Sequence, residues 1–164
     1  MEVGTSSVLM LPYTASSVGV ARRRLIGDLS EAGVSEATGC DAGLVLSELI
    51  SNALRHATPL PGRVVRVAWW LDEDCLEIAV SDGGGPTVPV VNDPGHSAIG
   101  GRGLGIVDRL ALRWGVCSPP DSAGETTVWA ELALSPDKAD KHSDAGSSAD
   151  RRPRRLVITS SRDA

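Results

Sequence analysis

Two β-rich runs lie close together in the middle of the chain and constrain its fold more than any other feature. The runs are "RVVRVAWWL" at 63–71 and "CLEIAVSD" at 75–82, and only "DED" separates them. Taken together the two runs are rich in β-branched and aromatic residues, so their close spacing predicts an antiparallel hairpin. Because a sheet must bury at least one face, the segments on either side of the hairpin have to supply the layer that covers it.

The segments before the hairpin predict one strand and two helices. The run "VLMLPY" at 8–13 has the composition of a short strand. Apolar residues recur at helical spacing in residues 14–33 and again in residues 35–57. The run "TPLPG" then breaks the chain before the hairpin.

The segments after the hairpin predict a long loop, a third helix and two more strands. Residues 83–103 are rich in Gly and Pro, and loops of that length in compact domains are usually functional or disordered. We expect a helix over residues 104–115, then a short strand, a turn and a final strand over residues 126–134. Helices on one face of a mixed, mostly antiparallel sheet make an α+β fold, a two-layer α/β sandwich.

Length and composition are those of one globular domain with a tail. The 164 residues are 41% apolar but only 3% aromatic, with no Phe, so the core must be built from aliphatic side chains. We expect the domain to span residues 1–134. Residues 135–164 are polar and low in apolar content, and we expect them to form a disordered C-terminal tail.

Charge and cysteine content exclude several classes of function. Residues 1–134 hold 9 Lys and Arg against 16 Asp and Glu, which disfavours direct binding of nucleic acid. No apolar run approaches the ~20 residues that span a bilayer, and the N-terminus lacks the pattern of a signal peptide. Three separated cysteines predict neither a disulfide framework nor a zinc site. These features predict a cytoplasmic protein without a membrane segment.

The second predicted helix carries two polar side chains that its apolar face does not explain. Glu48 and Asn52 are one turn apart, on the side that also carries Asp41 and Arg55. A solvated helix face is the simplest interpretation. A functional pair, one residue binding a metal and the other acting as a base, is the alternative, and the poor helix propensity of Asn weakly favours it.

The end of the hairpin carries a second signal, because three glycines follow Asp82 directly. A Gly-rich turn with Asp at its first position is common and needs no function. The functional interpretation is that Asp82 accepts a hydrogen bond from an exocyclic amine of a ligand. Gly84 would then allow the ligand ring to approach the backbone without a Cβ in the way.

A third signal is the glycine cluster that leads into the third predicted helix. Gly101, Gly103 and Gly105 would leave free backbone N–H groups at a helix N-terminus, where phosphate binds readily. A flexible hinge is the alternative. The cluster is not a P-loop, since no G-K-[ST] follows, and it fits the dinucleotide fingerprint poorly.

Taken in order, these stretches resemble the N, G1 and G2 boxes of the GHKL ATPase superfamily, which includes DNA gyrase and the histidine kinases. The matching stretches are "ELISNALRHA", "VSDGGGP", "GGRGLGIVDRL" and "TTVWAEL". Within the superfamily they most resemble the bacterial anti-sigma-factor serine/threonine kinases. The resemblance covers roughly residues 8–134 and implies the Bergerat (GHKL) ATP-binding fold with ATP and Mg²⁺ as cofactors.

The resemblance also implies roles for the residues of the first two stretches. Asn52 corresponds to the residue that coordinates Mg²⁺ beside the nucleotide phosphates, and Glu48 to the presumed general base. Asp82 corresponds to the aspartate that recognises the adenine amino group, and Gly84 to the glycine of close approach. His56 lies where some members carry a histidine, although an interaction with the helix dipole is the simpler interpretation.

The remaining stretches correspond to the phosphate-binding lid and the last strand. The lid residues implied by the resemblance are Gly101, Arg102, Gly103, Leu104 and Gly105. Residues 86–100 would form the mobile part of this lid. Thr127 corresponds to the threonine that supports Asp82 at the adenine, and Thr126 remains an alternative for this role.

The implied function is an ATP-dependent serine/threonine protein kinase. It would phosphorylate an anti-anti-sigma-type partner and sequester a sigma factor, and it would typically form a homodimer. A nucleotide-dependent binding module with little or no phosphotransfer is the alternative. A histidine-kinase catalytic domain is disfavoured because no phosphoacceptor helix pair precedes it. The tail cluster "RRPRR" could contact an acidic partner, or the tail could be solvated with no fixed role.

Overall fold

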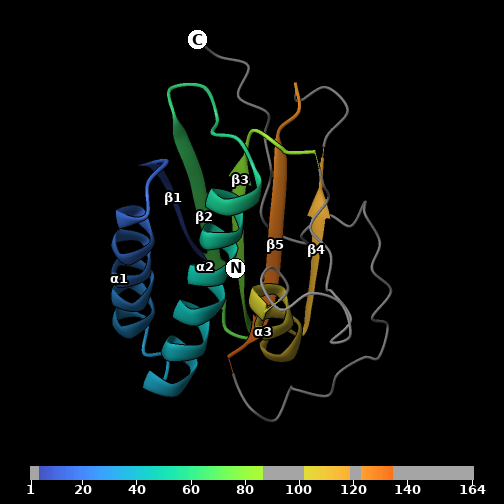
Figure 1. Ribbon diagram of the computed structural model, residues 1–164. Coiled ribbons are helices and arrows are strands. Elements are labelled where there is room, and N and C mark those ends of the chain that lie inside the picture. The colour runs from blue at the N-terminus through green and yellow to red at the C-terminus, as the bar shows by residue number, and fades with distance from the viewer. Residues whose placement is uncertain (1–3, 87–101, 119–122, 135–164) are drawn as a thin grey trace.

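The computed structural model describes residues 4–86, 102–118 and 123–134 as one sheet covered by three helices (Figure 1). In chain order the elements are β1 (Thr5–Pro12), α1 (Ser16–Glu31), α2 (Glu36–His56), β2 (Val64–Leu71), β3 (Cys75–Asp82), α3 (Arg102–Leu110), β4 (Arg113–Cys117) and β5 (Thr126–Ala133). The predicted glycine-rich loop and the predicted tail lie almost wholly outside these ranges.

The sheet has the strand order β1-β2-β3-β5-β4, and all four described pairings are antiparallel. Figure 1 shows α1, α2 and α3 on the same side of this sheet. The predicted α+β class, a two-layer sandwich with helices on one face, is therefore confirmed. β2 and β3 form the predicted hairpin, and Asp72 Oδ1 closes its turn by accepting hydrogen bonds from the backbone N–H groups of Asp74 and Cys75, both at 2.8 Å.

The core between the two layers is aliphatic, as the composition requires. Alternate residues of β2 and β3 face the helices, because successive side chains on a strand point to opposite faces. Val67, Trp69 and Ile78 are among those buried on this side. Trp69 also anchors α1, since its indole Nε1 donates to Asp28 Oδ2 at 3.1 Å while Ser7 Oγ donates to the same oxygen at 2.9 Å.

The prediction of one helix over residues 104–115 is wrong at both ends. Helix α3 begins at Arg102 and ends at Leu110, and the residues that follow form β4. The chain leaves the helix because the backbone N–H of Leu112 donates to Glu131 O of β5 at 2.7 Å. Pairing with a strand distant in sequence therefore overrides the helical spacing of the apolar residues.

No helix among the described residues is both long enough and apolar enough to cross a membrane.

Candidate functional site

Helix α2 presents Asn52 and Glu48 on its flank away from α1. Gly43 marks the other flank, because a Cβ there would lie 3.1 Å from Ile26 Cδ1 and 3.3 Å from the Arg22 side chain of α1. Asn52 is nine residues beyond Gly43, which is two and a half turns, so it points in the opposite direction. Because α2 lies between α1 and α3 (Figure 1), this flank is turned toward α3.

Both polar residues are only partly exposed. Asn52 and Glu48 are half-buried, while the nearby Asp41 and Arg55 are exposed. The polar side of α2 is thus divided into an exposed strip, with Asp41 and Arg55, and a half-buried or sheltered strip, with Glu48 and Asn52. The sheltered strip is the one that carries the predicted metal ligand and the predicted base, which argues against a simple solvated face.

The end of α2 is tied to the glycine run that follows β3. Thr58 N and Thr58 Oγ1 both donate to Gly84 O, at 2.8 and 2.9 Å, and Gly83 N donates to Thr58 O at 2.8 Å. These three hydrogen bonds join segments that are 26 residues apart. They fix the position of the end of β3 relative to the last turns of α2, where Asn52 lies.

The three glycines after Asp82 are required by protein packing. A Cβ on Gly83 would lie 2.4 Å from Pro59 O, and a Cβ on Gly85 would lie 2.4 Å from His56 O. Gly84 has φ +80°, and a Cβ there would lie 2.2 Å from Gly124 O. The close approach at Gly84 is therefore between two backbone segments of the same chain, whether or not a ligand is present.

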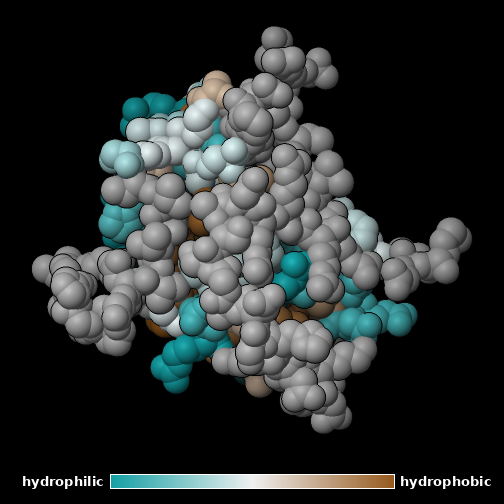
Figure 2. Space-filling view, turned by 90° about the vertical axis from the view of Figure 1, so that its right-hand side faces the viewer, coloured by the Kyte–Doolittle hydropathy of each residue, from teal (hydrophilic) through white to brown (hydrophobic). Residues whose placement is uncertain are grey.

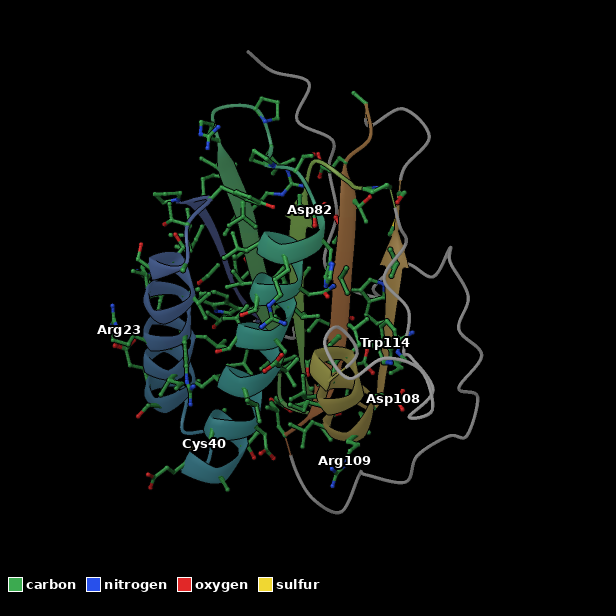
Figure 3. All side chains as sticks on the ribbon, in the orientation of Figure 1. Arg23, Cys40, Asp82, Asp108, Arg109 and Trp114 are labelled. Atoms are coloured by element: carbon green, nitrogen blue, oxygen red, sulfur yellow. The ribbon has the colours of Figure 1, made fainter. Side chains whose placement is uncertain are left out.

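Asp82 is a buried carboxylate at the end of β3. It is 4% exposed, and its Oδ1 accepts a hydrogen bond of 2.7 Å from Gly84 N. Burial raises the pKa of Asp82 to about 6, the Gly84 hydrogen bond opposes this shift, and the negative charge of Glu125 adds to it. Figure 3 shows Asp82 beside the upper end of α2, at the end of its strand.

Tyr13, the residue directly after β1, also contacts the end of α2 and was not singled out in the sequence. Its hydroxyl lies within hydrogen-bond distance of Ala53 O, at 2.7 Å, and of Ala57 O. These carbonyls belong to the last turn and the C-cap of α2, and Ala53 O also accepts from Ala57 N at 3.0 Å, so Tyr13 adds a second hydrogen bond at the end of this helix. Burial and the charge of Asp82 both raise the pKa of Tyr13, so the phenol stays protonated beside the carboxylate.

The strand register places Thr126 opposite Asp82 and Thr127 opposite Ser81. Opposed residues of an antiparallel pair share one face of the sheet, and the next residue points to the other face. Asp82 therefore shares the helix-covered face with Thr126, which is half-buried. The expected contact between Thr127 and Asp82 is not found, because Thr127 lies on the far face.

Thr127 contributes to a polar cluster behind Asp82. Its hydroxyl is 2.6 Å from Ser81 Oγ, and Arg66 Nη2 donates to the same Ser81 oxygen at 3.3 Å. Arg66 also forms an ion pair with Glu125, the residue that precedes β5. The cluster thus links β2, β3 and β5 immediately behind the residue that carries the buried carboxylate.

Only part of the predicted phosphate-binding glycine cluster lies in the described residues. Gly101 lies outside them, and so does the side chain of Arg102, although Arg102 and Gly103 belong to the first turn of α3. The Leu104 side chain is 4% exposed and packs in the core, so only its backbone can reach a ligand. A Cβ on Gly105 would meet nothing within 4 Å.

The start of α3 nevertheless offers the chemistry that phosphate requires. The first four backbone N–H groups of a helix have no partner within the helix, and the helix dipole adds positive potential there. The nine-residue α3 begins in this glycine-containing segment. No acidic residue occupies its first turn to compete with an anion.

A magnesium ion would have few protein ligands in this site. No group of three or more His, Cys, Asp or Glu in residues 4–86, 102–118 and 123–134 could hold a metal ion. Asn52 offers an amide oxygen, a hard ligand of the kind that Mg²⁺ accepts. Such a donor set suits an ion that keeps waters and takes its other ligands from substrate phosphates.

The candidate site involves the end of β3, the start of β5 and the helices α2 and α3. Figure 2, which views the molecule from the β4 side, shows mainly hydrophilic described atoms outermost, with hydrophobic atoms visible between them. On this side Trp114 Nε1 donates to Asp108 Oδ1 at 2.9 Å and fastens β4 to α3 (Figure 3). A buried acceptor, a sheltered amide and a helix N-terminus are therefore held on rigid elements.

Comparison with known proteins agrees with this architecture. A family model described as the histidine kinase-like ATPase domain matches residues 11–131, which is most of the chain. The chain belongs to this family, and hence to the GHKL superfamily that the order of its motifs predicted. Membership in a family of ATPase domains implies that the chain binds ATP. No curated protein matches it.

A solved structure shares the fold. It is the crystal structure of the RsbU and RsbW domains of Rv1364c from Mycobacterium tuberculosis, with a TM-score of 0.59 and 20% sequence identity. The match covers 79% of this chain and 33% of that chain. At this identity the likeness concerns the fold alone.

Proposed function

We propose that this chain is an ATP-dependent anti-sigma-factor serine/threonine protein kinase. It would bind Mg-ATP, phosphorylate a Ser or Thr of an anti-anti-sigma-type partner and sequester a sigma factor. The observation that carries the nucleotide part is the buried Asp82, held beside the end of α2 by the hydrogen bonds between Thr58 and Gly84. The rest is supported by the resemblance of the four motifs, in their order along the chain, to those of the anti-sigma-factor kinases.

In this proposal Asp82 recognises the adenine ring. Its carboxylate is fixed through one oxygen by Gly84 N, so the other oxygen is left for the exocyclic amine. Guanine presents a carbonyl oxygen at the corresponding position, which would oppose a buried carboxylate. Thr126, which lies opposite Asp82 in the strand register, would support this contact.

The phosphates would lie between α2 and the start of α3. Asn52 would hold a Mg²⁺ ion that also contacts phosphate oxygens, and the ion would supply neutralisation of phosphate charge. The backbone N–H groups of residues 102–105 would bind the phosphates. Gly101 and Arg102 would extend this cradle in the lid.

Glu48 would act as the base toward the acceptor hydroxyl. It lies one turn before Asn52 on the same sheltered flank of α2, so both residues would be near the transferred phosphate. A carboxylate in that position can accept the proton of a Ser or Thr hydroxyl as it attacks. The sequestering module without phosphotransfer would need Asn52 and Asp82 but would have no need of this base.

Calorimetric titration with Mg-ATP and with Mg-GTP tests the nucleotide site. We expect binding of ATP but not GTP, and loss of binding in Asn52→Ala and in Asp82→Ala. Arg23→Ala is the matched control, because Arg23 lies on the exposed side of α1, away from the site (Figure 3). Failure of ATP to bind at millimolar concentration would contradict the proposal.

Transfer of labelled γ-phosphate to anti-anti-sigma-type proteins of the same genome tests the kinase activity. Glu48→Gln should keep the ATP affinity of the wild type while phosphotransfer to the acceptor is lost. If the wild type binds ATP but labels no such protein, the chain is a nucleotide-dependent binding module. If Glu48→Gln labels the acceptor as fast as the wild type, Glu48 is not the base.

A further inference from the structure

The sheet face opposite the helices, here called the outer face, is the side of the strands that carries Arg66, Glu77, Trp129 and Glu131. The register aligns its side chains in rows that cross the sheet. One row runs from Trp70 through Glu77 and Glu131 to Arg113. The next row contains small residues, Ala68, Ala79 and Gly115, around Trp129.

The part of the outer face formed by β3 and β5 is buried even though no helix of the described residues lies on it. Glu77 and Trp129 are both 0% exposed in the single chain, and Glu131 is 6% exposed. All three described helices lie on the other side of the sheet (Figure 1). Side chains on an uncovered sheet face remain largely accessible to water, so this degree of burial calls for a covering segment.

The chemistry of the outer face specifies what can cover it. Two carboxylates, those of Glu77 and Glu131, oppose each other directly across β3 and β5. Arg113 forms an ion pair of 2.9 Å with Glu131 and lies 5.0 Å from the centre of the Trp129 ring. The Nε–H groups of Trp70 and Arg113 are buried and have no acceptor within the part of the chain that the structure describes. A covering peptide should therefore bring positive charge and backbone carbonyl groups.

The chain's own C-terminal segment has this chemistry. Residues 151–158, "RRPRRLVI", contain four arginines and no acidic residue. The described chain ends beside the acidic row, because Leu134 N donates to Asp74 O at 3.1 Å, only three residues after Glu131. The intervening residues 135–150 can span about 50 Å when extended, whereas a sheet of five strands is roughly 20 Å wide.

We propose that residues 151–158 dock on the outer face, with arginines against Glu77 and Glu131. Arginine suits this position, since its guanidinium pairs with carboxylates and stacks on aromatic rings. Pro153 favours the extended backbone that a shallow row of small residues can accept. The outer face would thus be an intramolecular docking surface, on the side of the sheet away from the nucleotide site.

A second copy of the chain is the competing occupant. Val8 and Met10 of β1 belong to the same face and are 62% and 54% exposed, so the surface continues as an apolar strip to the edge of the sheet. Two identical acidic rows would repel each other, however, and this disfavours direct contact between two copies there. The basic segment is complementary where a second copy is not.

Hydrogen–deuterium exchange of the full chain tests this proposal. We expect the amides of residues 151–158 to exchange about tenfold or more slowly than in the free peptide, at any protein concentration. Replacing all four arginines, Arg151, Arg152, Arg154 and Arg155, by Ser should abolish this protection, as should high salt. The matched control Lys138→Ser/Lys141→Ser removes charge elsewhere in the tail and should leave the protection unchanged.

The face itself is tested with Glu77→Gln, which keeps the size of the side chain. It should weaken protection of residues 151–158, whereas Glu73→Gln, an exposed residue in the turn between β2 and β3, should not. Exchange as fast as in the free peptide would overturn the proposal. Protection that appears only as the protein dimerises would assign the outer face to a second copy. These outcomes do not depend on ATP binding.

Discussion

The helix-covered face and the outer face of the sheet bury their side chains by different means. On the helix-covered face, aliphatic side chains of both layers interdigitate, and burial of apolar surface provides the driving force. On the outer face, the buried residues include Glu77, Glu125, Glu131 and Thr127, which have to be satisfied by hydrogen bonds and ion pairs. Apolar burial on the helix-covered face stabilises the fold, whereas the buried polar groups of the outer face require hydrogen-bond and ion-pair partners.

The candidate site lies where the residues of β3 on the helix-covered face change from apolar to charged. Val80 is the last apolar residue of β3 on that face, and the next residue on the same face is Asp82. A carboxylate there is costly to bury and does not help to fill the core. The comparison teaches that the buried carboxylates of the outer face belong to a network of side chains, whereas Asp82 on the helix-covered face is held by a backbone hydrogen bond from Gly84.

The largest effect should follow from a cavity in the helix-covered face. Ile78→Ala should lower the free energy of unfolding by about 2–5 kcal/mol, because the side chain is fully buried and leaves a void. Val8→Ala on the outer face is the control, since Val8 is largely exposed and should change it by less than about 0.5 kcal/mol. Denaturant unfolding measures the free energy of unfolding of both variants. Equal decreases would contradict the statement that burial of apolar side chains stabilises mainly the helix-covered face.

Asp82→Asn should separate binding from stability. Loss of a hydrogen bond to a charged acceptor costs about 1.5–3 kcal/mol, so ATP should bind roughly 10- to 150-fold more weakly in a calorimetric titration. The variant should also be more stable than the wild type at pH 8. If Asp82→Asn binds ATP with the affinity of the wild type, Asp82 does not contact the nucleotide.

The sign of this stability change follows from the pKa of Asp82, which the fold raises from 3.8 to about 6. The native state resists ionisation of Asp82, so its contribution to stability is present below pH 3.8 and is lost as pH rises through about 6. Thermal unfolding should therefore show Asp82→Asn gaining over the wild type above pH 6, with the difference vanishing near pH 4. A difference that is constant with pH would refute this assignment.

Two glycines of the candidate site should respond in opposite ways to alanine. Gly84→Ala should lower the free energy of unfolding by more than about 1 kcal/mol, because its φ is positive and the Cβ would overlap Gly124 O. Gly105→Ala should raise it by up to about 1 kcal/mol, since it lies in α3 with free space around it. If Gly105→Ala also weakens ATP binding, that glycine serves the ligand.

The smallest effects should come from the two neighbouring threonines of β5. Thr127→Val should lower the free energy of unfolding by about 1 kcal/mol, because the bond to Ser81 is lost, and should leave ATP affinity unchanged. Thr126→Val should weaken ATP binding instead, with little change in stability. Thermal unfolding measures the stability of both variants, and calorimetry measures their ATP affinity. If Thr127→Val weakens ATP binding and Thr126→Val does not, Thr127 rather than Thr126 supports the nucleotide.

The sequence alone determined the elements whose signals are local. The hairpin, the first two helices and the covering of one sheet face follow from residue spacing, turn chemistry and the need to bury one face. The same spacing placed Glu48 and Asn52 on one side of a helix, and the end of a strand placed Asp82 before its glycines. These inferences hold because side-chain periodicity within an element is set by backbone geometry alone.

Only the tertiary structure decided the features that depend on distant segments. Strand pairing with β5 ended α3 at Leu110, and the register put Thr126 rather than Thr127 on the face of Asp82. Contacts with the end of α2 and with Gly124 explain the glycine run, and Tyr13 contacts the end of α2 from the residue after β1. A shift of register by one residue exchanges the two faces of a strand, and no local pattern fixes that register.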